Sequence, residues 1–282
     1  MLEAAPAALL GHRRSLTALR SLVFNVVFYI NTIAILVLVT PVYFFLPQAG
    51  SMAVVRWWGV SSLWLLRVIC GTSVEFRGVS NIPKSGFIAS VKHQSLWETF
   101  ALLPLFRDPA YVIKRELLYV PIWGWWAAKV RMIFVSRGRG PRALRQMAAG
   151  AAREAKRGRP IVIYPEGTRR PAGAPPAYRF GIVFLYRQID VPVVPVALNS
   201  GLYWPRRKFL RHPGTVIVEF LPPIAPGLSQ EAFMDELVRA TESACDRLLL
   251  EAASGSTPPP LPPEAEARLA ELRTGSPAAL AE

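Results

Sequence analysis

The first quarter of the chain is predominantly apolar. No charged residue occurs from Ser21 to Val55, and residues 21–46 (SLVFNVVFYINTIAILVLVTPVYFFL) form the most hydrophobic run. At about 1.5 Å per residue, a helix of this length crosses a hydrocarbon core of roughly 30 Å. The run is too long for the apolar region of a cleaved signal peptide, so we expect a retained membrane helix. A single buried core helix is the alternative.

A second apolar stretch follows a turn signal. Residues 47–51 (PQAGS) are typical of a turn, and residues 52–70 predict another helix. Three of its tryptophans suit a membrane interface: Trp57, Trp58 and Trp64. Basic residues lie in the N-terminal segment, residues 1–20, and again after the apolar run, which by the positive-inside rule places both ends on the cytoplasmic side. We therefore predict a membrane-embedded helical hairpin over residues 21–70, either re-entrant or spanning twice.

Beyond residue 70, short β-branched runs alternate with helical stretches. This pattern predicts a mixed, largely parallel α/β sheet flanked by helices, in one domain over residues 71–252. The expected strands are residues 73–76, 87–91, 110–113, 132–135, 160–164, 191–198 and 215–220. The expected helices are residues 96–106, 142–157, 180–188 and 229–250. Residues 253–282 are Pro-rich, which predicts a mobile tail.

Composition narrows the class of protein. Of the 282 residues, 52% are hydrophobic, which is high for a soluble domain, and the formal net charge is +14. A basic chain with long apolar segments favours an anionic membrane surface or phosphorylated substrates over nucleic acid, for which stacking and zinc motifs are lacking. The two cysteines, Cys70 and Cys245, lie in unrelated contexts, so neither a metal site nor a disulfide framework is predicted.

One histidine has the spacing of a catalytic base. His93 follows a predicted strand, where α/β folds place reactive groups, and Glu98 stands five positions later. Five positions along one helix do not face each other, so the pairing requires His93 to lie in the turn before the helix. The alternative is structural, because Ser95 and Glu98 match a capping box. From spacing alone, Glu98 either orients His93 or caps the helix.

Two further strand ends carry basic residues. The run Tyr164 to Arg169 (YPEGTR) predicts a tight turn that exposes backbone amides next to guanidinium groups. Arginine matches phosphate oxygens in a bidentate geometry, and Gly167 permits close backbone approach. Arg137 follows another predicted strand in the same way. A surface turn with solvated arginines is the alternative for the YPEGTR run.

Taken together, these blocks resemble the glycerolipid acyltransferase family, in particular the 1-acylglycerol-3-phosphate acyltransferases. The blocks are His93 with its carboxylate, Arg137, the YPEGTR turn and residues 191–196 (VPVVPV). Lys114, followed by Pro121 and Gly124, also resembles a segment that the family places between its first two blocks. The family usually has aspartate where this chain has Glu98.

The resemblance implies a fold and a reaction. The fold is a glycerol-3-phosphate acyltransferase-like α/β sheet, and the reaction moves an acyl group from a thioester to the sn-2 hydroxyl of 1-acylglycerol-3-phosphate in phospholipid biosynthesis. His93 would be the base and Glu98 its orienting acid. The implied substrate-binding residues are Lys114, Arg137, Glu166, Gly167, Thr168 and Arg169, with Glu166 orienting either the glycerol hydroxyls or the arginines.

The same resemblance implies the partners. Acyl-CoA or an acyl-carrier protein would serve as co-substrate, no further cofactor or metal is expected, and the lipid acceptor would come from the bilayer. The catalytic domain would face the cytoplasm at the inner membrane. Two alternatives stay open: acylation of another lyso-lipid, such as a lyso-aminolipid, and a non-catalytic lipid-binding role.

Overall fold

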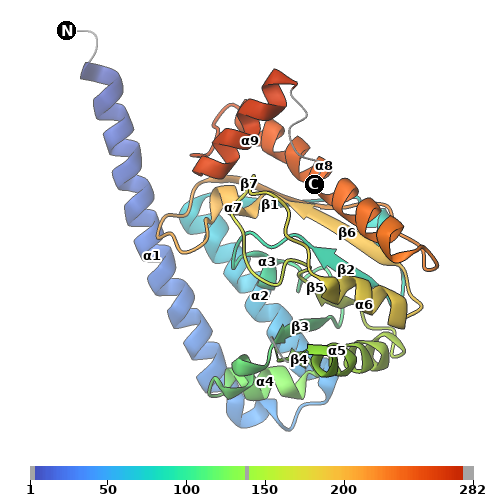
Figure 1. Ribbon diagram of the computed structural model, residues 1–282. Coiled ribbons are helices and arrows are strands. Elements are labelled where there is room, and N and C mark those ends of the chain that lie inside the picture. The colour runs from blue at the N-terminus through green and yellow to red at the C-terminus, as the bar shows by residue number, and fades with distance from the viewer. Residues whose placement is uncertain (1–3, 137–139, 276–282) are drawn as a thin grey trace.

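Two long apolar helices form an N-terminal hairpin in the computed structural model, which describes residues 4–136 and 140–275. Helix α1 spans Ala4–Tyr43, and α2 spans Gln48–Cys70 and packs against it. Figure 1 shows α1 as a long rod along one side of the molecule, with α2 running back toward the sheet. The predicted hairpin is therefore confirmed, with its turn a few residues earlier than expected, because Pro47 stands at the N-cap of α2.

Helix α1 buries only one side against the rest of the protein. Phe24 and Phe28 are buried, whereas Ile30, Ile33 and Leu38 are 61%, 59% and 76% exposed. A helix that is apolar all round but buried on one side leaves its outer face for another apolar phase. Both hairpin helices are long and apolar enough to cross a membrane. The alternative of a single buried core helix is wrong.

A seven-stranded sheet forms the body of the protein, in the order β1-β7-β6-β2-β5-β3-β4. The strands are β1 Thr72–Arg77, β2 Ile88–Val91, β3 Ala110–Lys114, β4 Ile133–Val135, β5 Ile161–Ile163, β6 Val193–Leu198 and β7 Gly214–Phe220. All neighbouring pairs are parallel except β6 and β7, which are antiparallel. The predicted strands and the mixed, largely parallel sheet are confirmed.

Alternate residues of the central strands pack against different layers. Ile88 and Ile161 face the core beneath α5 (Gly140–Ala155) and α6 (Phe180–Gln188). Their neighbours Ala89 and Val162 face the core beneath α2 and the short helix α3 (Glu98–Ala101). Because both faces are covered, every residue of the central strands β2, β5 and β6 is buried, and buried and exposed residues do not alternate along them.

Helix α3 is much shorter than expected. The apolar spacing predicts a helix over residues 96–106, but regular helix ends at Ala101 and the chain continues in turns. Pro104 disfavours helical geometry at the residue before it. The structure also contains short elements that the hydrophobic pattern does not resolve: the 3-10 helices η1 (Val79–Asn81) and η2 (Arg115–Tyr119), α4 (Trp123–Lys129) and α7 (Ser200–Tyr203).

The predicted mobile tail contains a docked helix. After α8 (Gln230–Ser254), helix α9 spans Pro263–Thr274 and packs against α8. Ala265 and Leu269 are buried, and Arg268 forms two hydrogen bonds to the carboxylate of Asp246 at 2.6 and 3.0 Å. The prediction of a mobile tail is wrong for α9, because these few apolar residues share one buried side of the helix. Residues 276–282 lie outside the described part of the chain.

Candidate active site

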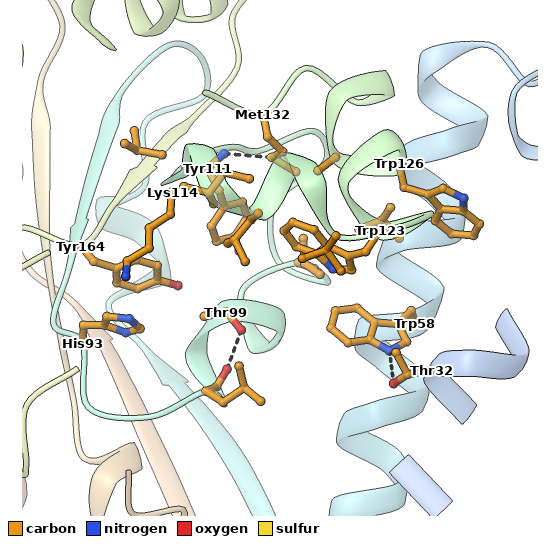
Figure 2. Close-up of a pocket in the computed structure, with 18 of the residues that line it drawn as sticks. Thr32, Trp58, His93, Thr99, Tyr111, Lys114, Trp123, Trp126, Met132 and Tyr164 are labelled. Carbon is orange, nitrogen blue, oxygen red and sulfur yellow. Dashed lines mark hydrogen bonds between the residues drawn. The ribbon is translucent and has the colours of Figure 1, made fainter. Parts of the chain in front are cut away.

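His93 lies in the loop that follows β2, at the carboxyl end of the strand. Its Nδ1 atom is 2.8 Å from Oε1 of Glu98. A carboxylate accepts hydrogen bonds, so this contact places the proton of a neutral imidazole on Nδ1 and leaves Nε2 as the basic nitrogen. Figure 2 shows the ring at the edge of a cavity. His93 therefore has the geometry of an oriented general base.

Glu98 orients His93 and also holds the loop that precedes α3. Its carboxylate is fully buried, and Oε1 also accepts the backbone N–H groups of Gln94 at 2.8 Å and Ser95 at 2.7 Å. The hydroxyl of Ser95 accepts the N–H of Trp97 at 3.2 Å, and Trp97 itself is the N-cap of α3 and has no side-chain cap. The predicted capping box is therefore only half formed, because Glu98 accepts the Ser95 N–H but Ser95 does not accept the N–H of Glu98. The interpretation of Glu98 as the residue that orients His93 fits the geometry.

A further hydroxyl holds the other oxygen of Glu98. Ser200, the first residue of α7, donates to Oε2 at 2.8 Å and is itself fully buried. The neighbouring Gly201 N–H donates to the side-chain oxygen of Gln94 at 3.0 Å. Sequence reasoning did not identify Ser200. Its only signal is its position just after a predicted strand, and the contact depends on β2 and β6 being adjacent in the sheet.

The ring of Tyr164 stacks on the ring of His93 and so helps to fix its plane. The two rings are stacked, with centroids 4.0 Å apart and an interplanar angle of 21°. Burial raises the pKa of the Tyr164 phenol, so its hydroxyl stays protonated. That hydroxyl forms no hydrogen bond with the described residues, and Tyr164 lines the cavity next to His93.

The YPEGTR turn is tied directly to the histidine loop. The backbone N–H of Arg170 donates to the carbonyl oxygen of His93 at 2.8 Å. Gly167 has a φ of +67°, a left-handed conformation that favours glycine, and its N–H donates to the Tyr164 carbonyl at 2.9 Å. Gly167, Thr168 and Arg169 line the cavity, as predicted from the motif.

Lys114 reaches the same part of the cavity from the end of β3. Figure 2 shows its side chain extending toward His93 and Tyr164. The cavity lining therefore combines five of the predicted residues: His93, Lys114, Gly167, Thr168 and Arg169. Arg137, which was predicted for the same site, lies outside the described residues.

Glu166 does not lie in this cavity. Its side chain is buried beneath the turn, where Oε1 is 3.1 Å from Nζ of Lys92 and 3.7 Å from Nε of Arg170. The predicted contact with substrate hydroxyls does not fit this geometry, and the arginine next to Glu166 is Arg170, not one of the two predicted to bind the substrate phosphate.

A buried charge cluster joins this carboxylate to α8. Lys92 also contacts Oε1 of Glu242 at 2.8 Å, and Tyr178 donates to the same oxygen at 2.8 Å. Burial alone would lower the pKa of Lys92, but the carboxylates of Glu242 and Glu166 raise it above its ordinary value. Lys92 therefore stays charged and links the histidine loop, the YPEGTR turn and α8.

The cavity has a volume of about 710 Å³ and differs in character along its length. Cationic side chains line one part: Lys114, Arg169, Arg206 and Arg207. Apolar side chains from both hairpin helices and α4 line another: Ile35, Leu36, Val55, Trp58, Trp123 and Trp126. No carboxylate of the described residues lines it. Figure 2 shows His93 beside Lys114 and Tyr164, with Trp58, Trp123 and Trp126 on the other side of the view. Such a space suits an anionic amphiphile.

Comparisons with known proteins agree with this site. Residues 73–199 match the family model described as Acyltransferase. A 1-acyl-sn-glycerol-3-phosphate acyltransferase from Pseudomonas aeruginosa is 39% identical over 175 residues, which cover 62% of this chain and 68% of that protein. One of the same name from Saccharomyces cerevisiae is 27% identical over 190 residues, which cover 66% of this chain and 61% of that protein.

A solved structure shares the fold. The crystal structure of a 1-acyl-sn-glycerophosphate acyltransferase from Thermotoga maritima matches with a TM-score of 0.68 and 24% identity, covering 82% of this chain and 97% of that one. The match extends beyond the residues of the family model, so the shared fold is larger than the motif-bearing segment.

Proposed function

Since this chain belongs to the acyltransferase family, we propose that it moves a fatty acyl group from an acyl thioester to the sn-2 hydroxyl of 1-acylglycerol-3-phosphate, which gives phosphatidate. The observation that carries the proposal is the oriented His93–Glu98 pair at a cavity that is cationic in one part and apolar in another. Family membership favours an enzyme over a non-catalytic lipid-binding protein. The names of the relatives favour this acceptor over a lyso-aminolipid.

The chemistry follows from the orientation of His93. Nε2 takes the proton of the acceptor hydroxyl as its oxygen attacks the thioester carbonyl carbon. The new C–O bond forms, the C–S bond breaks, and the imidazolium returns the proton to the departing thiolate. Glu98 stabilises the imidazolium through Nδ1 and keeps the ring in one orientation. No acyl-enzyme is required, because the acceptor oxygen is itself the nucleophile.

The cationic part of the cavity binds the phosphate of the acceptor in this proposal. Lys114 ends β3 and Arg169 lies in the turn that follows the adjacent strand β5, and both line the cavity together with His93 and Tyr164. The backbone at Gly167 and Thr168 allows close approach of an anion, and Arg137 is the further cation that the sequence supplies. Glu166 contributes indirectly, because it holds Lys92 and Arg170 behind the turn.

The apolar part of the cavity receives an acyl chain. It is lined by α4 and by both hairpin helices, α1 and α2. The exposed apolar faces of these two helices indicate membrane association. A lipid can therefore reach His93 from the bilayer without exposing its chain to water. We place the catalytic domain on the cytoplasmic side of the cell inner membrane, with acyl-CoA or an acyl-carrier protein as donor.

A defined acyl-transfer assay tests the proposal. Protein in vesicles receives one labelled acyl thioester and a panel of lyso-acceptors that includes 1-acylglycerol-3-phosphate and a lyso-aminolipid. We expect the label in phosphatidate, and we expect His93→Ala to abolish transfer because no other described side chain in the cavity is suited to act as base near neutral pH. A thermal unfolding curve for His93→Ala that matches the wild type shows that the fold is intact.

Two outcomes would contradict the proposal. Label transferred only to the lyso-aminolipid would assign a different acceptor to the same site. Full activity of His93→Ala would remove His93 from the reaction.

A further inference from the structure

A basic loop lies between α1 and the catalytic turn. We call residues 204–211 (WPRRKFLR) the basic loop. Its last residue is fixed to the membrane helix: the Arg211 guanidinium donates to Oδ1 of Asn25 at 3.0 Å, and its backbone N–H donates to the Ser21 hydroxyl at 2.8 Å. The same guanidinium lies 4.2 Å from the ring centre of Trp204. The loop is therefore held against α1 at both of its ends.

The middle of the basic loop points toward the cavity. Arg206 and Arg207 both line it. Nη1 of Arg206 donates to the backbone carbonyl of Arg169 at 2.7 Å, so this arginine reaches the YPEGTR turn. Arg207 has a φ of +57°, which is uncommon for a residue with a side chain. Such backbone conformations cluster where a side chain is held for a ligand.

The cations of the cavity lack an internal counter-charge. Lys114, Arg169, Arg206 and Arg207 line the same space, and among the described residues none of them forms an ion pair with a carboxylate. Four like charges around one opening repel each other unless an anion neutralises them. Two of the four come from the basic loop, which belongs to none of the motifs that identified the site.

We propose that Arg206 and Arg207 form an arm that binds the phosphate monoester of the acceptor lipid at the mouth of the cavity. The inference rests on the proposed function and adds two residues to its substrate site. Phe209, two positions further on, is 50% exposed beside α1, so the arm lies where an apolar side chain can also meet lipid. The phosphate is thus held by the catalytic turn on one side and by the membrane-anchored loop on the other.

The test compares adjacent residues of one loop. Arg207→Gly removes the guanidinium and suits the left-handed backbone, so it does not strain the turn. Lys208→Ala removes the neighbouring charge, which does not line the cavity, and is the matched control. Acylation of 1-acylglycerol-3-phosphate is measured in micelles of an uncharged detergent, where no bulk anionic lipid competes. We expect Arg207→Gly to raise KM for the acceptor about ten-fold or more with kcat within about two-fold.

The control separates this role from general attraction to anionic lipid. Lys208→Ala is expected to keep KM within about two-fold, and Arg207→Lys to recover part of the lost affinity through its charge. The proposed role of the arm would be overturned if KM for the acceptor were equal in Arg207→Gly, Lys208→Ala and the wild type. Weaker sedimentation of Arg207→Gly with anionic vesicles would not change that conclusion, because it reports only general attraction to anionic lipid. Failure of the wild type to acylate this acceptor would instead overturn the proposed function, so the two failures are distinguishable.

Discussion

The Glu98 carboxylate accepts hydrogen bonds on both oxygens and is sealed from solvent. Three donors meet Oε1 and the Ser200 hydroxyl meets Oε2, so the carboxylate cannot rotate without losing several bonds at once. Because Glu98 is fixed, its partner His93 is held in one orientation and loses little freedom when substrate binds. The side chain of glutamate, one methylene longer than that of aspartate, reaches two backbone N–H groups of the preceding loop, His93 and Ser200 together.

Ser200→Ala tests whether this fixed position matters for catalysis. The change leaves Oε2 of a buried carboxylate without its partner, so we expect kcat to fall about ten-fold while KM for the acceptor stays within about two-fold. Steady-state kinetics with the acyl thioester provide the measurement.

Ser90→Ala is the matched control for this change. It deletes another buried hydroxyl, on β2, that has no hydrogen-bond partner among the described residues. An equal loss of kcat in both variants would mean that Ser200 acts only through packing.

At the scale of elements, the N-terminal hairpin and the C-terminal helix α9 are held to the rest of the protein by different kinds of contact. The hairpin packs through large aromatic side chains, among them Phe28 against Phe100 and Trp204, with ring centres 5.9 Å apart in each pair. Helix α9 instead buries two small or medium apolar residues and adds the Arg268–Asp246 pair. A helix with so small a buried side depends on each of its contacts.

Leu269→Ala measures how firmly α9 is docked. Leu269 is 6% exposed and belongs to the main core cluster, so truncation is expected to lower the free energy of unfolding by about 2 kcal/mol or more. Denaturant unfolding followed by circular dichroism provides the value. Arg273→Ala, on the exposed side of the same helix, should change it by less than about 0.5 kcal/mol. Equal stabilities of Leu269→Ala and wild type would mean that α9 is not docked in solution.

At the scale of the whole molecule, the catalytic cavity is shared by the sheet and the hairpin. The segments after β2, β3 and β5 supply His93, Lys114 and Arg169, and the basic loop supplies Arg206 and Arg207. Helices α1, α2 and α4 supply apolar lining. Figure 1 shows α1 leaning against the body along one side, so its outer face is free to contact a bilayer. In the proposed function, membrane attachment and substrate access would both depend on α1 and α2.

Ile33→Asp tests the membrane contact. Ile33 lies in the middle of the apolar run and is 59% exposed, so a carboxylate there costs about 3 kcal/mol in a hydrocarbon core. We expect vesicle binding, measured by flotation, to weaken about 100-fold while the circular dichroism spectrum is unchanged.

An exposed leucine elsewhere provides the comparison. Leu228→Asp replaces a side chain that is 39% exposed just before α8, and should leave vesicle binding within about two-fold of the wild type. Unchanged flotation of Ile33→Asp would mean that α1 does not enter the bilayer.

The sequence by itself determined the elements that local physics specifies. Short apolar and β-branched runs predict all seven strands, and the long uncharged stretch predicts the hairpin. Both kinds of element follow from the local sequence, because their burial is set by a run of neighbouring residues. The sequence also predicts the His93–Glu98 pair and the YPEGTR turn, since each motif lies within a few positions of one strand end. The sequence pattern did not predict helix α9, because the buried side of this helix consists of two residues in a Pro-rich segment.

Only the tertiary structure decided which distant groups meet. Ser200 lies 102 positions from Glu98 in the sequence and touches it only because β6 is next to β2. Glu166 has the sequence context of a binding residue, yet its side chain is buried against Lys92 and does not line the cavity. Arg206 and Arg207 belong to no motif in the sequence, and they reach the cavity because Trp204 and Arg211 pack against α1. Such contacts depend on strand order and helix packing, which no local pattern encodes.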